Sequence, residues 1–318
     1  KLWEGLSQEL NFNVMFSQRG VLNLGHSLQD MRDIQRRVNA NRLNGIDGVV
    51  LSTAEVQARV PLMNCSPNAR YPILGASWQP RGGTARHDAV AWGYARGADA
   101  LGVDLIQQTE VTGIRRHNGA VVGVETANGF IGARKVACVT AGNSGVMAAM
   151  AGLRLPIESR PLQALVSEPL KPLLDCVVMS NQVHVYVSQS DKGELVMGAG
   201  IDAHTSYTQR GAFHIIEDQM ASAIELFPMF SRLRVMRTWA GIVDVCPDAS
   251  PIIGETPVPH LYINCGWGTG GFKAIPGSGW GFAELMAKGE SPLTEQFGLD
   301  RFRAGRFIDE SVAAGVAH

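Results

Sequence analysis

The sequence predicts two interleaved domains: an α/β domain with a nucleotide-binding sheet, and an α+β domain built on an antiparallel sheet. First, the 318 residues exceed the size at which a single hydrophobic core usually stops growing. Second, residues 136–145 combine an apolar strand, a glycine turn and a helix start, an order typical of nucleotide-binding sheets. Third, residues 156–245 contain strand-like runs separated by turns, together with one long helix.

The composition is that of a globular protein with a large core, and it argues against several kinds of partner. Hydrophobic residues make up 45% of the chain and charged residues 18%, and the net charge is −1. This balance argues against nucleic acid or an anionic membrane as the main partner. No apolar run in the sequence approaches the ~20 residues that span a bilayer.

The five cysteines are dispersed and form no CxxC pair (Cys65, Cys138, Cys176, Cys246 and Cys265). An odd, scattered set in a chain of this size is typical of a reduced, cytoplasmic protein without a disulfide framework or a zinc site. Cys138 and Cys265 lie within apolar strand-like runs, so we expect them to be buried as small hydrophobic residues.

The first part of the chain carries clear helix signals. Ser27 is a suitable N-cap for a helix with Asp30 three positions later, and Gly45 is a suitable end for it. Pro61 is expected to end another helix. In order, we expect a helix at 1–12, two short strands within 12–27 that meet at Gly20, a helix at 27–45, a strand followed by a helix within 49–61, and a loop at 61–73.

A turn followed by a helix occupies residues 78–96, WQPRGGTARHDAVAWGYAR. Proline and paired glycines at 79–83 predict a tight turn, and apolar residues recur with helical spacing from Asp88 onward, with Thr84 or Asp88 as the cap. His87 therefore lies near the positive end of a helix, in a turn whose backbone can approach a ligand closely. Taken alone, the residue is better explained as a surface or first-turn histidine that has no task.

The remaining segments follow a strand-rich pattern with two further helices. The hairpin signals HNG and ANG separate the strands 110–116, 120–126 and 130–142, and the run 136–140 is apolar enough for a strand buried on both faces. Beyond these we expect strands at 160–170, 176–189, 194–202 and 262–265, a helix at 213–230, a loop at 266–271, and a helical segment at 274–288 interrupted by Pro276 and Gly277. Residues 76–155 and 246–318 are assigned to the nucleotide-binding domain, and residues 1–75 and 156–245 to the substrate domain.

Three segments resemble the D-amino-acid-oxidase-like flavoprotein superfamily: WAGIVDVCPDASPIIG (239–254), LYINCGWGTGGFKAIPGSG (261–279) and VACVTAGNSG (136–145). The resemblance implies a Rossmann-like FAD/NAD(P)-binding domain of the glutathione-reductase type, interleaved with an antiparallel substrate domain. The superfamily places a G-x-G-x-x-G strand–turn–helix unit at the N-terminus, and this sequence has no such motif. We therefore expect a truncated FAD-binding domain that lacks its first βαβ unit.

Within that superfamily, residues 78–107 resemble the β subunits of heterotetrameric sarcosine oxidases. Those subunits bind FAD non-covalently and carry FMN covalently, through a histidine at the position of His87. The resemblance therefore makes His87 the anchor of an FMN, bonded through one imidazole nitrogen to the flavin 8α-methyl group. Arg86 and Arg81 then either stabilise negative charge on the flavin or its phosphate, or remain solvated turn cations.

Lys273 follows a glycine loop and matches the superfamily's lysine beside the flavin. Its ammonium group can hold the carboxylate of an amino-acid substrate or stabilise the reduced flavin, whereas the alternative is a surface lysine at a helix start. The loop's N–H groups are expected to face the flavin carbonyl edge, and Asp248 is expected to be structural. The cofactor-binding positions implied by the resemblance are His87, Arg86, Val111 (at the adenine end of FAD), Gly142, Gly268, Thr269, Gly270, Gly271 and Lys273; His184 and Tyr186 are weaker candidates for facing the substrate.

The resemblance implies an enzyme that demethylates sarcosine to glycine, with formaldehyde or methylene-tetrahydrofolate and hydrogen peroxide as the other products. Electrons would pass from FAD to FMN to oxygen. The implied partners are sarcosine oxidase α, γ and δ subunits, with tetrahydrofolate bound through a partner subunit, in the cytoplasm. Two alternatives remain open: a dehydrogenase for dimethylglycine, an opine or proline-type amines that passes electrons to a partner, and a non-enzymatic assembly module.

Overall fold

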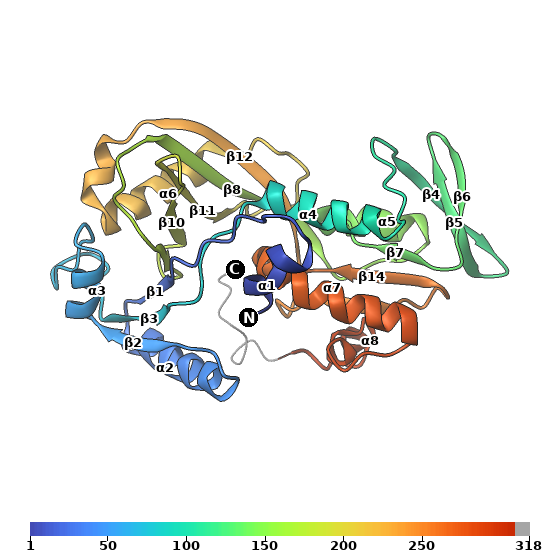
Figure 1. The fold of residues 1–318 in the computed structure, drawn as a ribbon, viewed down its shortest axis with the longest axis horizontal. Helices are drawn as coiled ribbons and strands as arrows, with labels where there is room; N and C mark the ends of the chain where they lie inside the picture. The colour runs from blue at the N-terminus through green and yellow to red at the C-terminus, as the bar shows by residue number, and fades with distance from the viewer. Residues whose placement is uncertain (309–318) are drawn as a thin grey trace.

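The computed structural model describes residues 1–308, and in that part of the chain three sheets are surrounded by helices (Figure 1). The largest sheet has eight strands in the order β12-β8-β11-β10-β9-β1-β3-β2. Its strands are antiparallel to their neighbours except for the pair β1 and β9, which is parallel. The strands are β1 (Val21–Gly25), β2 (Val49–Ser52), β3 (Gly75–Gln79), β8 (Glu158–Pro169), β9 (Val177–Ser180), β10 (Val185–Gln189), β11 (Glu194–Ile201) and β12 (Val235–Val245).

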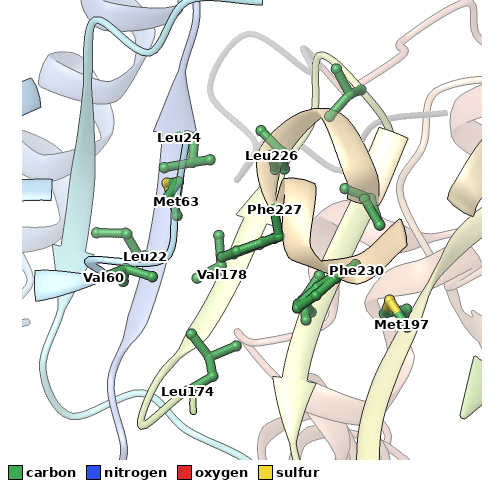
Figure 2. Close-up of a cluster of buried hydrophobic side chains, with 14 of the residues drawn as sticks. Leu22, Leu24, Val60, Met63, Leu174, Val178, Met197, Leu226, Phe227 and Phe230 are labelled. Carbon is green, nitrogen blue, oxygen red and sulfur yellow. The ribbon is translucent and has the colours of Figure 1, made fainter. Parts of the chain in front are cut away.

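One face of the large sheet forms the main hydrophobic core. Helix α6 (Phe213–Leu226), the 3₁₀ turn η2 (Pro228–Arg232) and helix α3 (Thr53–Arg59) contribute side chains that cover it. Figure 2 shows Phe227 and Phe230 directed toward Val178 of β9 and Met197 of β11. Burying a phenylalanine side chain stabilises a fold by roughly 1.5–3 kcal/mol, so this core fixes the sheet.

The opposite face of the same sheet carries a row of directly paired residues. Asn23 pairs with Met179, Met179 with Tyr186, and Tyr186 with Gly198. A Cβ atom at Gly198 would lie 2.8 Å from the Tyr186 hydroxyl, so the tyrosine ring lies against this glycine. Burial raises the pKa of the Tyr186 phenol. These side chains alternate with those of the core, as strand geometry requires.

Two three-stranded sheets lie apart from the large one. In the first, β14 (Leu261–Cys265) pairs with β13 (Ile252–Glu255) in antiparallel fashion and with β7 (Val136–Cys138) in parallel. The second is a meander of β4 (Val111–His117), β5 (Ala120–Thr126) and β6 (Gly129–Gly132). Cys138 and Cys265 are buried, as predicted from their apolar surroundings.

Three helices with separate places in the chain pack together through a small core. They are α1 (Leu2–Glu9), α4 (His87–Ala100) and α7 (Gly271–Lys288), and Figure 1 shows α1 between the other two. The core consists of Leu6, Val14 and Val90, with Trp3, Leu10, Phe16, Ala85, Tyr94 and Ile275 around them. The remaining helical segments are α2 (Leu28–Leu43), η1 (Ala141–Asn143), α5 (Ser144–Met150), η3 (Gly268–Gly270), η4 (Glu295–Phe297) and α8 (Asp300–Arg303).

Several predicted elements are confirmed. The helix at 27–45 forms with a capping box between Ser27 and Asp30. Helix α1 lies within 1–12, a strand and a capped helix lie within 49–61, and residues 61–73 contain no helix or strand.

Other boundaries were predicted wrongly. Residues 130–142 form two strands because β6 pairs with β5 whereas β7 pairs with β14. The segment 176–189 is a hairpin of β9 and β10, and only one strand forms within 12–27, with a single bridge at Ser17. Helix α7 begins at Gly271 and runs through Pro276 without a break, although an interior proline removes one backbone hydrogen bond.

Strand β7 is less buried than its apolar sequence predicts. Among its residues only Cys138 is buried, and the following Val139 is 59% exposed. In the described part of the chain β7 pairs with β14 alone and forms the edge of its sheet. Ala137 is exposed and Val136 only partly buried, so the prediction of burial on both faces is wrong here.

Two elements lie across the predicted domain boundary at residue 75. Strand β3 pairs with β1 and β2 in the large sheet, and helix α1 packs with α4 and α7. Hydrogen bonding therefore places β3 with the large sheet, and apolar packing places α1 with α4 and α7, although their positions in the sequence predict the opposite assignment. Residues 309–318 of the predicted nucleotide-binding domain lie outside the described residues. Within residues 1–308, no helix has the length and apolar character needed to cross a membrane.

Candidate functional site

A glycine turn connects strand β14 to helix α7. Gly266 and Gly268 have φ values of +74° and +51°, in the left-handed region that glycine adopts without strain. A Cβ atom at Gly266 would lie 2.3 Å from the Cys246 sulfur, so no larger residue fits there. By contrast, a Cβ at Gly268 would meet nothing within 4 Å. The turn is therefore closely packed at Gly266, against Cys246, and open at Gly268.

A buried carboxylate lies beneath this turn. Asp244, at the end of β12, is 2% exposed, and its Oδ2 accepts a hydrogen bond of 2.5 Å from the Gly266 N–H. Burial raises the pKa of Asp244, although the N–H groups of Gly266, Trp267 and Gly268 favour its ionised form. Sequence reasoning missed this residue; its signal was one acidic side chain between Val243 and Val245 in an apolar run.

Lys273 lies in the first turn of α7 and is an unpaired cation. In the described part of the chain its ammonium group makes no hydrogen bond and no ion pair. Its side chain is exposed by surface area, yet enough protein surrounds the ammonium group for desolvation to lower its pKa. The Lys273 carbonyl accepts a 2.9 Å hydrogen bond from Trp3 Nε1, so its backbone is held while its side chain is free.

The start of α7 suits a planar group with a polar, electron-rich edge. Among the described residues no side chain caps this helix, so its first N–H groups have no side-chain acceptor there. A Cβ atom at Gly270 would meet only the Lys273 Cε, at a distance of 4.0 Å. Open space over the turn, uncapped N–H groups and an unpaired ammonium group together fit the carbonyl edge of a flavin.

His87 is the first residue of α4 and is exposed. Arg86 precedes it as the N-cap, and its guanidinium group pairs with the Asp88 carboxylate at 2.6 Å. Hydrogen bonding to Arg86 lowers the pKa of Asp88. Neither Thr84 nor Asp88 caps the helix as predicted: Thr84 forms a backbone bridge with Ser17, and Asp88 lies inside the first turn.

The turn before His87 is held by the N-terminal segment. A Cβ at Gly83 would lie 1.8 Å from the Ser17 carbonyl oxygen, so the backbones touch at this point. Arg81 donates to Glu4 through Nε at 2.6 Å and also lies 3.5 Å from Asp47. Its charge therefore already has two carboxylate partners within this chain.

Helix α1 brings the segments of His87 and Lys273 to one region of the molecule. Ala85, just before His87, and Ile275, just after Lys273, belong to the small core formed with α1. The Trp3 ring lies 5.4 Å from the Phe272 ring. Two candidates far apart in sequence are thus attached to a common support.

The other predicted residues lie elsewhere. Val111 begins β4 in the separate meander. A Cβ at Gly142 would lie 2.4 Å from Ile242, so close packing against β12 accounts for this glycine. His184, with a φ of +48°, lies in the turn before β10, whereas Tyr186 lies on the face of the large sheet opposite the main core. None of these four contacts the α7 start through a described interaction.

Asp248 is structural, as the sequence predicts. Its carboxylate accepts hydrogen bonds from Arg301 Nε at 2.8 Å and Nη2 at 3.0 Å. Both side chains are almost wholly buried, with exposures of 1% and 4%. The pair attaches helix α8 to the loop after β12.

Comparison with known proteins identifies the family. The profile of the FAD-dependent oxidoreductase family matches residues 1–285. The sarcosine oxidase β subunit of Rhodobacter capsulatus is 58% identical over 317 residues, which cover 100% of this chain and 76% of that protein. The corresponding subunit of an Arthrobacter species is 56% identical, with 100% and 79% covered.

Solved structures show the same fold. L-proline dehydrogenase from P. horikoshii superposes with a TM-score of 0.89 at 28% identity, covering 96% of this chain and 82% of the other. Glycine oxidase from Geobacillus kaustophilus gives a TM-score of 0.80 at 22% identity, covering 94% and 79%. The chain therefore belongs to the FAD-dependent oxidoreductase family, and within it to the group of sarcosine oxidase β subunits.

Proposed function

We propose that this chain acts as the β subunit of a sarcosine oxidase. Sarcosine, oxygen and water would yield glycine, formaldehyde and hydrogen peroxide, or the one-carbon unit would pass to tetrahydrofolate in a partner subunit. FAD, bound non-covalently, supplies the two-electron acceptor for the amine. The observation that carries the proposal is the unpaired Lys273 beside an open glycine turn, in a chain 58% identical to a sarcosine oxidase β subunit.

The role proposed for Lys273 is to hold the anionic partner of the reaction. An ammonium group without a counterion in the described chain is available for a substrate carboxylate or for the electron-rich edge of a reduced flavin. A charge-assisted hydrogen bond of this kind contributes roughly 1.5–3 kcal/mol. The open turn at Gly268–Gly271 leaves room for the ring next to it.

His87 is proposed to carry FMN covalently and to receive electrons from FAD before oxygen does. Its exposure at the first position of α4 leaves the imidazole accessible to a flavin 8α-methyl group. Arg86 would then balance charge on that flavin once released from Asp88. Val111 and Gly142 remain proposed contacts of FAD.

The covalent link is tested by mass spectrometry of the protein after denaturation. We expect the unmodified protein to retain the mass of one FMN on the peptide containing His87, and a His87→Ala variant to lose it. A His117→Ala variant, exposed at the end of β4, serves as the matched control and should keep the flavin. Retention of covalent flavin in His87→Ala would refute the assignment.

The assembly and location are also proposals. Relatives named as β subunits support a complex of several subunits, and we propose α, γ and δ sarcosine oxidase subunits as the partners. The five cysteines are all free, which supports a cytoplasmic location.

A second candidate is an amine dehydrogenase that transfers electrons to a partner instead of oxygen. The similarity to L-proline dehydrogenase, at a TM-score of 0.89 and 28% identity, favours this alternative over a non-enzymatic role. The two activities differ in peroxide: the oxidase forms one molecule for each amine oxidised, and the dehydrogenase forms none. A stable protein that takes up no flavin would instead favour the assembly module.

A further inference from the structure

We propose that Asp244 is the positioning residue of the flavin-facing glycine turn. The inference rests on the proposed function, because it concerns how this chain prepares the place where Lys273 and the flavin edge meet. It assigns a role to a side chain that neither holds substrate nor contacts the proposed flavin. Its action is through the backbone of the turn.

The geometry of the turn converges on one carboxylate. Asp244 Oδ2 accepts from the Gly266 N–H at 2.5 Å, and the N–H groups of Trp267 and Gly268 also stabilise the ionised side chain. Successive N–H groups directed at one anion require left-handed residues, and Gly266 and Gly268 provide them with φ of +74° and +51°. The carboxyl group that organises this concave backbone is thus part of the protein.

No cation competes for this carboxylate in the described chain. The nearby Arg301 donates to Asp248 and to the carbonyls of Phe297, Gly298 and Ser250. Asp244 forms no ion pair within residues 1–308. Because a buried charge without a counterion depends on its hydrogen bonds, Asp244 and the turn hold each other in place.

Because Asp244 holds residues 266–268, it also determines which groups lie on the opposite side of the turn. The Gly266 N–H is directed inward to Asp244, and the Gly270 N–H donates to the Trp267 carbonyl at 2.9 Å. The first turn of α7, which includes Lys273, lies on the open side of the turn. Trp267 is fixed as well, since its Nε1 donates to Asn264 Oδ1 at 2.7 Å.

Amide hydrogen exchange tests the anchor without any flavin chemistry. In the unmodified protein we expect slow exchange at Gly266, Trp267 and Gly268, and in Asp244→Asn at least a tenfold acceleration at these amides, with β14 unchanged. The matched control is Asp248→Asn, a second buried carboxylate on the same segment that bonds Arg301 and not the turn. It should lower stability while leaving exchange at Gly266 unchanged.

A flavin titration of the same variants tests the positioning role. We expect the dissociation constant for FAD and the KM for sarcosine to rise about tenfold or more in Asp244→Asn and to stay within about twofold in Asp248→Asn. Faster exchange with unchanged FAD affinity and KM would overturn the proposal, as would fast exchange at Gly266 in the unmodified protein. Exchange at Gly266 in the unmodified protein tests the proposal even if Asp244→Asn does not fold. An unmodified protein that binds no FAD would refute the proposed function, while the exchange data would still judge the anchor.

Discussion

Two buried carboxylates on one stretch of chain, Asp244 and Asp248, have opposite environments. Counted over the whole residue, Asp244 is 2% and Asp248 is 4% exposed, so both are almost removed from water. Burial raises the pKa of Asp244, and the N–H groups of the turn do not fully offset that effect. Burial acts in the same direction on Asp248, but hydrogen bonds and charge from Arg301 outweigh it and lower the pKa.

The difference distinguishes Asp248, which stabilises the fold, from Asp244, which positions the proposed site. Asp248 has a cation with a bidentate geometry, so its charge is neutralised wherever the rest of the turn lies. Asp244 has no such cation in the described chain and depends on the N–H groups of a glycine turn. A charge whose stabilisation requires one loop conformation selects that conformation, and here the selected loop leads into Lys273.

The largest expected effect is on stability when Asp248 loses its partner. Arg301→Met should reduce the free energy of unfolding by about 3–5 kcal/mol, because it leaves a buried carboxylate uncompensated. Urea unfolding measures the loss. Arg303→Met, exposed on the same helix, is the control and should change little. A loss as small as that of the control would show that the pair is not a stabilising element.

The next effect is on activity when Lys273 loses its charge. Lys273→Met should raise the KM for the amine by about tenfold to a hundredfold, as expected for a charge-assisted hydrogen bond worth roughly 1.5–3 kcal/mol. Stability should be almost unchanged, since the ammonium group has no partner in the described chain. Steady-state kinetics provide the measurement, with Lys288→Met, whose amine pairs with Glu284 at the other end of α7, as the control. Unchanged kinetics would remove Lys273 from the mechanism.

Sequence reasoning found the parts of the site that depend on local chemistry. Lys273 follows a run of glycines, and the helix start at Ser27 has its acidic partner three positions later. In both cases the information lies within a few residues, so a pattern can reveal it. The buried Asp248 was also expected to be structural, although its partner Arg301 was not foreseen.

The parts that were missed depend on contacts between distant segments. Asp244 acts on a turn that follows a different strand, and Trp3 donates to the carbonyl of Lys273 across 270 positions of the chain. Strand β3 was missed because its pairing with β1 and β2 defines it more than its own short sequence does. Apolar character alone also overestimated the burial of β7, since burial depends on neighbours that a pattern does not contain.

Acid should affect the two carboxylates in opposite directions. The pKa of Asp244 is raised above the unfolded value near 3.8, so its ionisation costs stability, and that cost disappears as the pH falls from neutral toward 3.8. The pKa of Asp248 is lowered, so its contribution is present above 3.8 and is lost only as the pH falls below that value. Unfolding should be measured at a series of pH values. Between neutral pH and 3.8 the free energy of unfolding of the unmodified protein should rise relative to that of Asp244→Asn, and it should show no such rise relative to that of Asp248→Asn. Parallel behaviour of the two variants would contradict the contrast.

The smallest expected effect concerns the second support of Lys273. Trp3→Phe keeps an aromatic ring against Phe272 but removes the N–H that donates to the Lys273 carbonyl. One such hydrogen bond contributes about 1 kcal/mol, which corresponds to a Tm lower by about 2 °C in a protein of this size. Trp280→Phe, 68% exposed on α7, is the control for the calorimetric measurement. Because Asp244 fixes the turn before α7 independently of α1, the KM should change by less than about twofold; a KM effect as large as that of Asp244→Asn would mean that the α1 contact, and not the buried carboxylate, sets the position of Lys273.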